Sequence, residues 1–288
     1  MFSRSLERHG TEVTVRRGAA EVARIDSLAE TAVLAPTVTI NAYGPRQLRT
    51  AVLWPSDHEP GSRRVPVLLD PYGGPGAQRV VSALDAYLVS QWFADQGFAV
   101  LVIDGRGVPG RGPAWDRSIR GDFATPVLED QIDALHHAAA GHADLDLGRV
   151  AIRGWSFGGF LAALAVLRRP DVFHAAVSGA PVTEHRLYDT HYMERYLGHP
   201  AEEPENYERC SLLGDAPNLL RPLLLIHGLA DDNVVVAHTL RLSMALTAAG
   251  RPHVVLPLSG VTHMTPQEVV AENQLRLELQ FLKQALGM

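Results

Sequence analysis

An α/β fold, with a mostly parallel sheet covered by helices on both faces, is predicted by two features of the chain. The first is a regular alternation of strand-like and helix-like segments from about Gln47 to the C-terminus. The second is that some strand-like runs, such as residues 65–70 and 98–104, are apolar up to a final aspartate, as strands buried on both faces are. Alternating strands and helices favour a parallel sheet, because each crossover helix packs back against it.

The first 45 residues differ from the rest of the chain. Residues 11–15 alternate in polarity as a strand does, residues 21–25 are a second expected strand, and Gly18 lies in the turn between them. An isolated hairpin is only marginally stable in water, so we expect it to pack against the main domain or another chain. We therefore predict an N-terminal extension over residues 1–45 and one α/β domain over residues 46–288.

Within the main domain the elements follow one another in a regular order. The expected strands cover residues 48–54, 65–70, 98–104, 149–153, 173–178, 222–227 and 253–258. The expected helices cover residues 80–96, 125–141, 160–167, 184–197, 234–249 and 265–286. Pro126 at the first turn and Gly141 at the end support the second helix, and Thr265 with Glu268 has the spacing of a capping box.

The composition is that of an ordinary globular protein. Hydrophobic residues make up 46% and charged residues 20% of the 288 positions, and the net charge is −6. No basic surface is expected, so neither nucleic acid nor an anionic membrane is an expected partner. The single cysteine, Cys210, excludes an internal disulfide, and the chain has no signal-peptide core and no apolar run of about 18 residues. We expect a cytoplasmic protein.

The sequence Gly-Trp-Ser-Phe-Gly-Gly at residues 154–159 lies between a strand-like run and an Ala/Leu-rich helical run. A serine flanked by glycines at a strand-to-helix turn is a nucleophile elbow, the hallmark of the α/β-hydrolase fold. The tight turn projects the Ser156 hydroxyl, and the N–H of Phe157 begins the helix, where it can stabilise an oxyanion. The pattern alone is weak, because three fixed positions at roughly 7% each arise by chance in about one chain in ten of this length.

A serine nucleophile needs a base and a carboxylate, which follow it in the order acid then histidine in this fold. Asp231 and Asp232 come after a predicted strand, 75 and 76 residues beyond Ser156, and His263 follows the last predicted strand. Groups at the carboxyl ends of parallel strands meet at one edge of the sheet. The residues therefore predict a triad of Ser156, His263 and one of the two aspartates, and leave the choice between the aspartates open.

Several longer motifs occur in the same order along the chain. They are the stretches at residues 68–75 (Leu-Leu-Asp-Pro-Tyr-Gly-Gly-Pro), 104–107 (Asp-Gly-Arg-Gly), 154–159 and 226–234 (Ile-His-Gly-Leu-Ala-Asp-Asp-Asn-Val). On these motifs the chain resembles the catalytic domain of the prolyl oligopeptidase family of serine peptidases over about residues 48–286. The resemblance is closest to the dipeptidyl-peptidase-IV branch.

The resemblance implies roles for individual residues. It selects Asp231 as the acid of the triad, and it makes Tyr72 the second oxyanion donor beside the N–H of Phe157. It implies a pocket for the residue before the scissile bond, lined by Tyr188 and Tyr192, which would share one face of a helix and form a slot for a proline ring. The remaining substrate-binding residues that it implies are Trp155, Val182, Asn233 and Val234.

Family members carry a β-propeller before the catalytic domain, and 288 residues are too few to include one. The first 45 residues are expected to correspond to the last propeller strands and the connecting segment. The residues that hold the substrate's amino terminus in the dipeptidyl-peptidase branch belong to the propeller. The resemblance therefore does not by itself imply strict dipeptide release, and the site is expected to be open to small esters and amides.

Three functions remain in competition. The first is a peptidase that cleaves after proline or alanine in short peptides, and the second is a carboxylesterase for short-chain esters with the same triad. The third is a non-catalytic binding domain, disfavoured because every triad position is filled. No cofactor is expected, since no Cys/His cluster has zinc spacing and the loop at residues 105–112 does not match a phosphate-binding loop. The expected partner is a small peptide or ester substrate, and homo-oligomerisation is consistent with a hairpin that lacks its own core.

Overall fold

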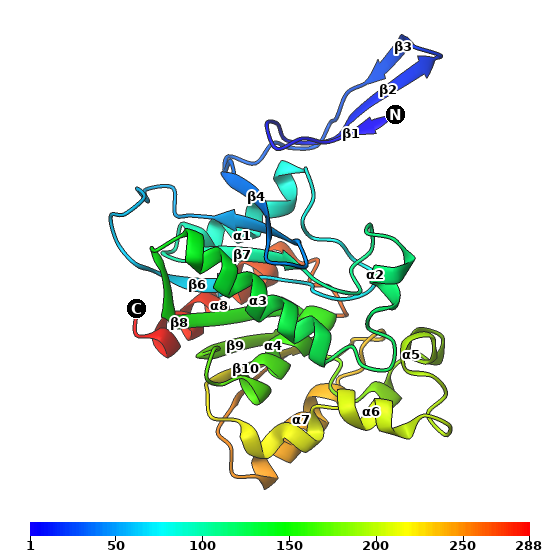
Figure 1. The fold of residues 1–288 in the computed structure, drawn as a ribbon, viewed down its shortest axis with the longest axis vertical. Helices are drawn as coiled ribbons and strands as arrows, with labels where there is room; N and C mark the ends of the chain where they lie inside the picture. The colour runs from blue at the N-terminus through cyan, green and yellow to red at the C-terminus, as the bar shows by residue number, and fades with distance from the viewer.

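The computed structural model describes residues 1–288 and has a central sheet of eight strands in the order β11-β10-β9-β8-β6-β7-β5-β4 (Figure 1). Its strands are β4 (Val38–Tyr43), β5 (Leu48–Leu53), β6 (Val65–Leu69), β7 (Ala99–Asp104), β8 (Leu145–Trp155), β9 (Ala175–Gly179), β10 (Leu223–Gly228) and β11 (Val254–Leu258). All neighbours from β11 to β7 pair in parallel, and only the pairs β7–β5 and β5–β4 are antiparallel. The predicted α/β-hydrolase fold is confirmed.

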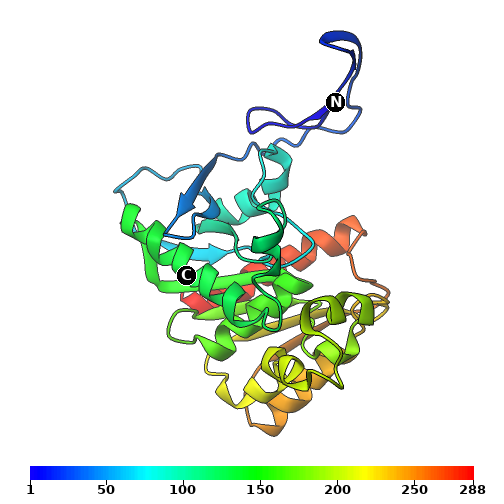
Figure 2. The ribbon, with the colours of Figure 1, turned by 45° about the vertical axis from the view of Figure 1, so that its right-hand side comes forward.

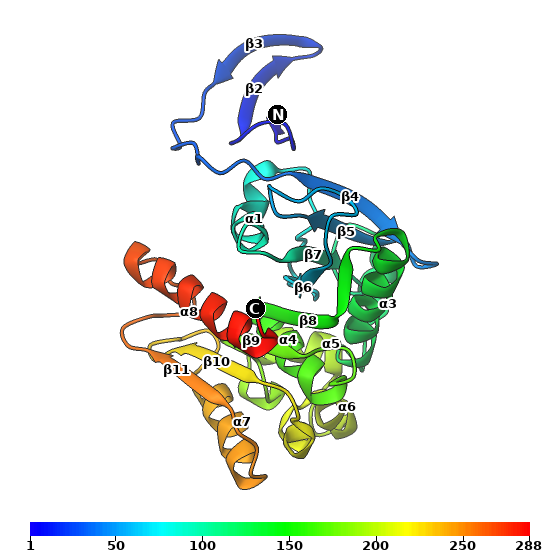
Figure 3. The same cartoon turned by 90° about the vertical axis from the view of Figure 1, so that its left-hand side faces the viewer.

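Helices cover both faces of the sheet, as the edge-on view of Figure 3 shows. One face carries α1 (Leu88–Ala94) and α8 (Glu268–Leu286), and the other carries α3 (Thr125–Gly141), α4 (Phe157–Arg168) and α7 (Ala237–Ala248). The shorter helices are α2 (Pro113–Arg117), α5 (Thr190–Leu197), α6 (Pro204–Cys210) and the 3₁₀ turns η1 (Leu84–Tyr87), η2 (His185–Leu187) and η3 (Leu213–Asn218).

The apolar strands explain how one sheet supports two cores. Side chains alternate across a strand, so Leu101 and Ile103 of β7 join the core under α3 and α4, whereas Val100 and Val102 join the core under α1 and α8. All six residues of β7 are buried. This double burial is the reason that the central strands are apolar throughout instead of alternating in polarity.

The prediction of a helix over residues 80–96 is wrong at its N-terminal end. The carboxylate of Asp104 accepts hydrogen bonds from the backbone N–H groups of Arg79 and Val80, the latter over 2.8 Å. The Tyr87 hydroxyl accepts a further bond from the N–H of Val81 over 2.9 Å. These tertiary bonds satisfy the donors that a helix would have used, so helical structure begins only at Leu84.

Two other helix predictions differ from the structure. The helix predicted at residues 184–197 is split into η2 and α5, because Tyr188 is extended (ψ 169°) and the Asp189 side chain caps α5. The capping box predicted at Thr265 is absent, since α8 begins at Glu268 without a side-chain cap. The hydroxyl of Thr265 instead donates to Oε1 of Gln274 over 3.1 Å.

The N-terminal residues form a small antiparallel sheet of β1 (Phe2–Ser3), β2 (Glu12–Arg17) and β3 (Ala20–Ile25). Figures 1 and 2 show it projecting from the rest of the molecule. It is joined to the main domain at Asp85, whose carboxylate accepts the N–H of Gly10 over 2.7 Å. The strand pairing also places β4 in the large sheet, so we propose that the boundary between extension and main domain lies between Ile25 and Val38, earlier than the predicted residue 45.

Candidate active site

Ser156 lies at the sharp turn between β8 and α4. Its backbone has φ 60° and ψ −118°, a conformation that L-residues rarely adopt and that costs free energy. The N–H of Ser156 donates to the carbonyl of Gly179 over 2.9 Å, and the carbonyl of Ser156 accepts from Phe160 over 3.0 Å. These two bonds hold the strained turn and leave the side chain half-buried at the carboxyl end of β8.

The glycines around Ser156 are required by close backbone contacts. A Cβ added at Gly154 would lie 2.3 Å from the carbonyl oxygen of Gly158, and a Cβ at Gly158 would lie 2.6 Å from the carbonyl oxygen of Pro71. Real atoms do not approach so closely, so only glycine fits at either position. The second contact brings the loop that carries Tyr72 directly against the start of α4.

The predicted acid and base of the triad are in contact. Nδ1 of His263 donates a hydrogen bond to Oδ2 of Asp231 over 2.8 Å. Oδ1 of Asp231 accepts the backbone N–H groups of Asn233 and Val234, over 3.0 and 2.8 Å. The Asp231 side chain is fully buried, whereas the neighbouring Asp232 is exposed. The geometry therefore favours Asp231 over Asp232 as the partner of His263.

A second bond holds the loop of His263 against the nucleophile elbow. The indole Nε1 of Trp155 donates to the carbonyl oxygen of His263 over 2.7 Å. Neither bond of His263 involves Ser156, and Nε2 of His263 has no protein partner. The Trp155 ring also fills the space beside Gly179, where an added Cβ would lie 2.0 Å from it. Trp155 was predicted to bind substrate, but these contacts also give it a positioning role.

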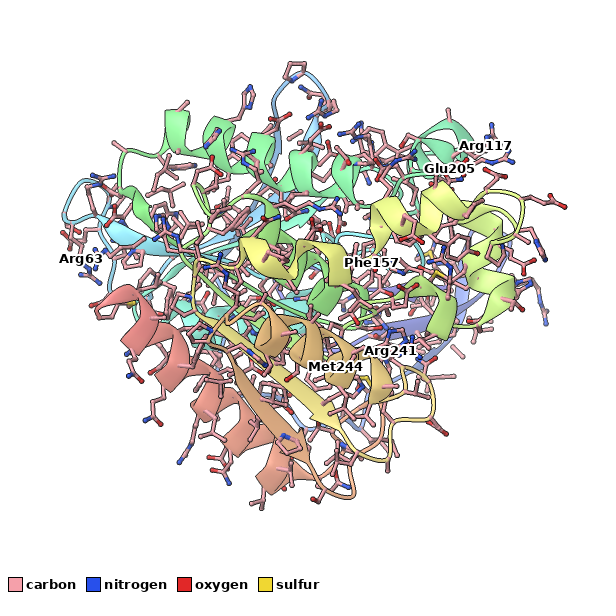
Figure 4. The ribbon with its side chains drawn as sticks, turned by 90° about the horizontal axis from the view of Figure 1, so that it is seen from below. Arg63, Arg117, Phe157, Glu205, Arg241 and Met244 are labelled. Atoms are coloured by element: carbon pink, nitrogen blue, oxygen red, sulfur yellow. The ribbon has the colours of Figure 1, made fainter.

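Tyr72 and Phe157 lie side by side, with ring centroids 5.9 Å apart. Phe157 is the first residue of α4, where backbone N–H groups lack partners within the helix, and its side chain is buried in the interior (Figure 4). Burial and the nearby Tyr188 raise the pKa of Tyr72, while the neighbouring Ser156 hydroxyl acts in the opposite direction. A raised pKa keeps the Tyr72 hydroxyl protonated at neutral pH, so it remains a hydrogen-bond donor beside Ser156.

The rings of Tyr188 and Tyr192 are in contact, but their arrangement differs from the prediction. Tyr188 precedes α5 and Tyr192 lies within it, so they do not share a helix face. Their rings are perpendicular, with centroids 5.6 Å apart. The Tyr188 hydroxyl donates to Oδ1 of Asn233 over 3.0 Å, and the Tyr192 hydroxyl donates to the carbonyl of Pro75 over 2.9 Å. The prediction that the two tyrosines share one face of a helix is wrong, because Asp189 starts a new helix after Tyr188.

The remaining pocket candidates are two valines and Asn233. Val182 and Val234 are both buried and belong to the same core cluster as Tyr188 and Tyr192. The bond from Tyr188 uses only Oδ1 of Asn233. The side-chain N–H donors of Asn233 remain available for another acceptor. Asn233 is exposed, so this donor is accessible from solvent.

The sequence analysis did not identify His227, a buried residue that lies next to the carboxylate of Asp231. Its Nε2 donates to the carbonyl of Val234 over 2.7 Å and lies 3.4 Å from Oδ2 of Asp231, and its Nδ1 lies 2.7 Å from the hydroxyl of Thr239. Burial lowers the pKa of His227, so this residue is neutral at pH 7. Its position before Gly228 at the end of a predicted strand was visible in the sequence, but its partners were not.

The structure contains no group of three or more His, Cys, Asp or Glu side chains with the geometry of a metal site. No helix combines the length and the apolar composition that crossing a membrane requires.

The chain has the α/β-hydrolase arrangement. A mostly parallel sheet carries the nucleophile elbow after β8, an acid after β10 and a histidine after β11. The model of the prolyl oligopeptidase family matches residues 85–288. The chain therefore belongs to the prolyl oligopeptidase family, a family of serine-type peptidases.

The chain is similar to dipeptidyl peptidase 8 of Mus musculus and of Homo sapiens, with 38% identity in each case over 204 residues. These matches cover 69% of this chain and 23% of each relative, so the chain spans about a quarter of their length. Among solved structures, dipeptidyl peptidase 4 of Porphyromonas gingivalis is similar with a TM-score of 0.87 and 28% identity. That match covers 98% of this chain and 41% of the other.

Proposed function

We propose that the chain is the catalytic part of a serine peptidase that cleaves after proline or alanine in short peptides. The observation that carries the proposal is the arrangement at one sheet edge, with Ser156 on a strained elbow, Tyr72 beside it and the bonded pair of Asp231 and His263. Dipeptidyl peptidase 8 and the other similar proteins carry names that agree with this function. They are longer proteins, so their activity comes to this chain only as a proposal.

In the proposed mechanism, Ser156 Oγ attacks the substrate carbonyl carbon while Nε2 of His263 takes the hydroxyl proton. Asp231 holds the imidazole through Nδ1 and stabilises the positive charge that forms on it. The tetrahedral oxyanion accepts hydrogen bonds from the Tyr72 hydroxyl and the N–H of Phe157. His263 then gives its proton to the leaving amine, and the acyl-serine is hydrolysed by water in the same two steps.

The side chain before the scissile bond would lie against Tyr188 and Tyr192, with Val182 and Val234 completing the apolar wall. Perpendicular aromatic rings present one face and one edge, a surface suited to a compact ring or methyl group. The free amide donors of Asn233 would bind a carbonyl of the substrate backbone. These features favour proline or alanine over long or charged side chains.

A short-chain carboxylesterase is the second candidate, because the same groups would hydrolyse an ester. The observation that favours it is exposure: the side chains of Ser156, Tyr72 and His263 are all partly open to solvent in this chain. An open site accepts small esters readily, and an alkoxide leaves more easily than an amine. The two functions differ in the leaving group and not in the triad.

The experiment compares Gly-Pro-p-nitroanilide, an N-blocked analogue of it, p-nitrophenyl acetate and p-nitrophenyl butyrate. Ser156→Ala is the blank and should lower turnover by about 10⁶-fold on any true substrate. Hydrolysis of the proline amides supports the peptidase, and cleavage of only the free-amine form supports a dipeptidyl peptidase. Ester hydrolysis without amide hydrolysis would replace the peptidase by the esterase, and equal rates for enzyme and blank would refute both.

A further inference from the structure

A continuous series of hydrogen bonds runs beneath the candidate site. Oδ1 of Asp70 accepts from Arg153 over 2.7 Å, and Nε of Arg153 donates to Oε2 of Glu278 over 2.9 Å. Oε1 of Glu278 accepts from Gln274 over 3.0 Å, and Oε1 of Gln274 accepts from Thr265 over 3.1 Å. Five side chains from the end of β6, from β8, from α8 and from the loop before α8 are thus joined in sequence; we call them the Arg153 network.

The Arg153 network includes a residue from three of the segments that carry proposed catalytic groups, those of Tyr72, Ser156 and His263, but none from the segment of Asp231. Asp70 is two residues before Tyr72, Arg153 is three residues before Ser156, and Thr265 is two residues after His263. Three segments that are far apart in the sequence are therefore linked through Arg153. The sequence motifs assigned none of the five network residues a role in the active site, although Asp70 lies within a matched stretch and Thr265 was predicted to cap a helix.

Arg153 is largely buried and is paired with two carboxylates. Its side chain is 13% exposed, and those of Asp70 and Glu278 are 2% and 1% exposed. Its guanidinium also lies over the Phe93 ring of α1, 4.7 Å from the centroid. Burial acts to lower the pKa of Arg153, but Glu278 and Asp70 outweigh it and raise the pKa, so the cation is permanent. A planar guanidinium can bond two carboxylates in fixed directions, whereas an ammonium cannot fix them in the same way.

Asp70 has further bonds that fix its position. Its Oδ2 accepts from Ser90 over 2.7 Å and from Arg79 over 3.2 Å. Burial acts to raise the pKa of Asp70, but Arg153 and Arg79 more than compensate, and the pKa lies below its ordinary value. Asp70 is therefore an anion at neutral pH, held from three directions. A rigid Asp70 limits how far the backbone of Tyr72 can move relative to β8.

The geometry points to Arg153 as a positioning residue for the proposed reaction, which holds the segments of Tyr72, Ser156 and His263 in register through the Arg153 network. The inference rests on the proposed function, since it assigns these three residues to one site. Arg153 does not touch the substrate, and its effect passes through Asp70 on one side and through Glu278, Gln274 and Thr265 on the other. A displacement of about 1 Å between reacting groups can reduce a rate about 10²-fold.

The test uses three variants of the full chain and measures kcat, KM, the rate of reaction with a serine-directed phosphonate, and the melting temperature. Arg153→Lys keeps the charge but loses the planar group that bonds Asp70 and Glu278 at the same time, and we expect kcat and the phosphonate rate to fall about 10²-fold with little change in KM. Thr265→Val removes only the last bond of the network, on a loop, and should lower kcat by about tenfold. Thr262→Val, three residues away and exposed, is the matched control and should leave both rates unchanged.

The double variant Arg153→Lys/Thr265→Val separates positioning from general destabilisation. If both residues act through one network, the double variant is no slower than Arg153→Lys alone. Additive losses, or losses that follow the melting temperature across the series, would overturn the inference. If Arg153→Lys does not fold, Glu278→Gln replaces it in the comparison of single and double variants. In that case an unchanged kcat in Thr265→Val would overturn the inference.

Failure of the inference differs from failure of the proposed function. A wild-type chain that hydrolyses none of the four substrates and does not react with the phosphonate refutes the function. A wild-type chain that is active, with network variants equally active, leaves the function intact and refutes the role of Arg153.

Discussion

The indole nitrogen of Trp155 donates a hydrogen bond to the main-chain carbonyl of His263 over 2.7 Å, across 108 residues of sequence. The residue before the proposed nucleophile thus holds the loop of the proposed base. Nδ1 of the same histidine is bound by Asp231, so His263 is fixed at both its backbone and its ring. Only Nε2, the nitrogen that would take the Ser156 proton, has no protein partner.

Replacement of Trp155 by phenylalanine should lower kcat by about tenfold, because it keeps an aromatic ring but removes the N–H that holds the His263 loop. KM for the same substrate should change little if the indole mainly positions this loop. Trp92→Phe, in α1, is the control, since Trp92 makes no side-chain hydrogen bond. A larger effect on KM than on kcat would show that Trp155 acts mainly by binding substrate.

Asp231→Asn should reduce kcat by about 10⁴-fold, because an amide can no longer hold the imidazole in the tautomer that accepts the Ser156 proton. Asp232→Asn should leave kcat within about twofold, because this side chain is exposed and makes no bond to His263. Steady-state rates of the two variants on one substrate decide the matter. A reversed order of the two effects would remove Asp231 from the triad.

Tyr72→Phe should lower kcat by about 10²–10³-fold, the usual effect of removing one oxyanion donor. The half-buried ring remains and the protein should keep its melting temperature. Tyr43→Phe is a suitable comparison, because it also removes one phenol hydroxyl but lies in β4 at the far edge of the sheet. If Tyr72→Phe and Tyr43→Phe have equal activity, Tyr72 does not stabilise the oxyanion.

Acid should destabilise the fold through His185. Burial lowers the pKa of His185 to about 3, and its Nδ1 has no partner. Between about pH 6.5 and pH 3 the unfolded chain binds a proton that the folded protein does not, so the free energy of unfolding falls as the pH is lowered. From pH 7 to pH 5 this single residue should account for about 2 kcal/mol of the loss.

Denaturant titrations at pH 7 and pH 5 test this assignment. His185→Gln retains a donor for the carbonyl of Cys210 but cannot titrate, so the difference in unfolding free energy between the two pH values should shrink by about 2 kcal/mol. His191→Gln, at an exposed position, should leave the difference unchanged. A pH dependence that is identical in wild type and His185→Gln would exclude His185 as its source.

The sequence by itself determined the order of strands and helices and the elbow at Ser156. The spacing of apolar residues, the apolar runs and the spacing of glycines are local signals that can be read from the sequence. The close backbone contacts at Gly154 and Gly158 show why no other residue fits at these two positions beside Ser156. The residues also limited the acid to Asp231 or Asp232 and gave His263. They did so because the order of loops at one sheet edge follows from strand order along the chain.

Only the tertiary structure decided which groups contact one another. The bond to His263 distinguishes Asp231 from its neighbour, and the carboxylate of Asp104 prevents a helix from starting at Val80. Arg153 is the clearest example of what the sequence does not reveal. Nothing in the sequence around this charged strand residue indicates that Asp70 and Glu278 are the partners that permit its burial. The two ion pairs of Arg153 join residues 83 and 125 positions apart, and a local pattern carries no information about them.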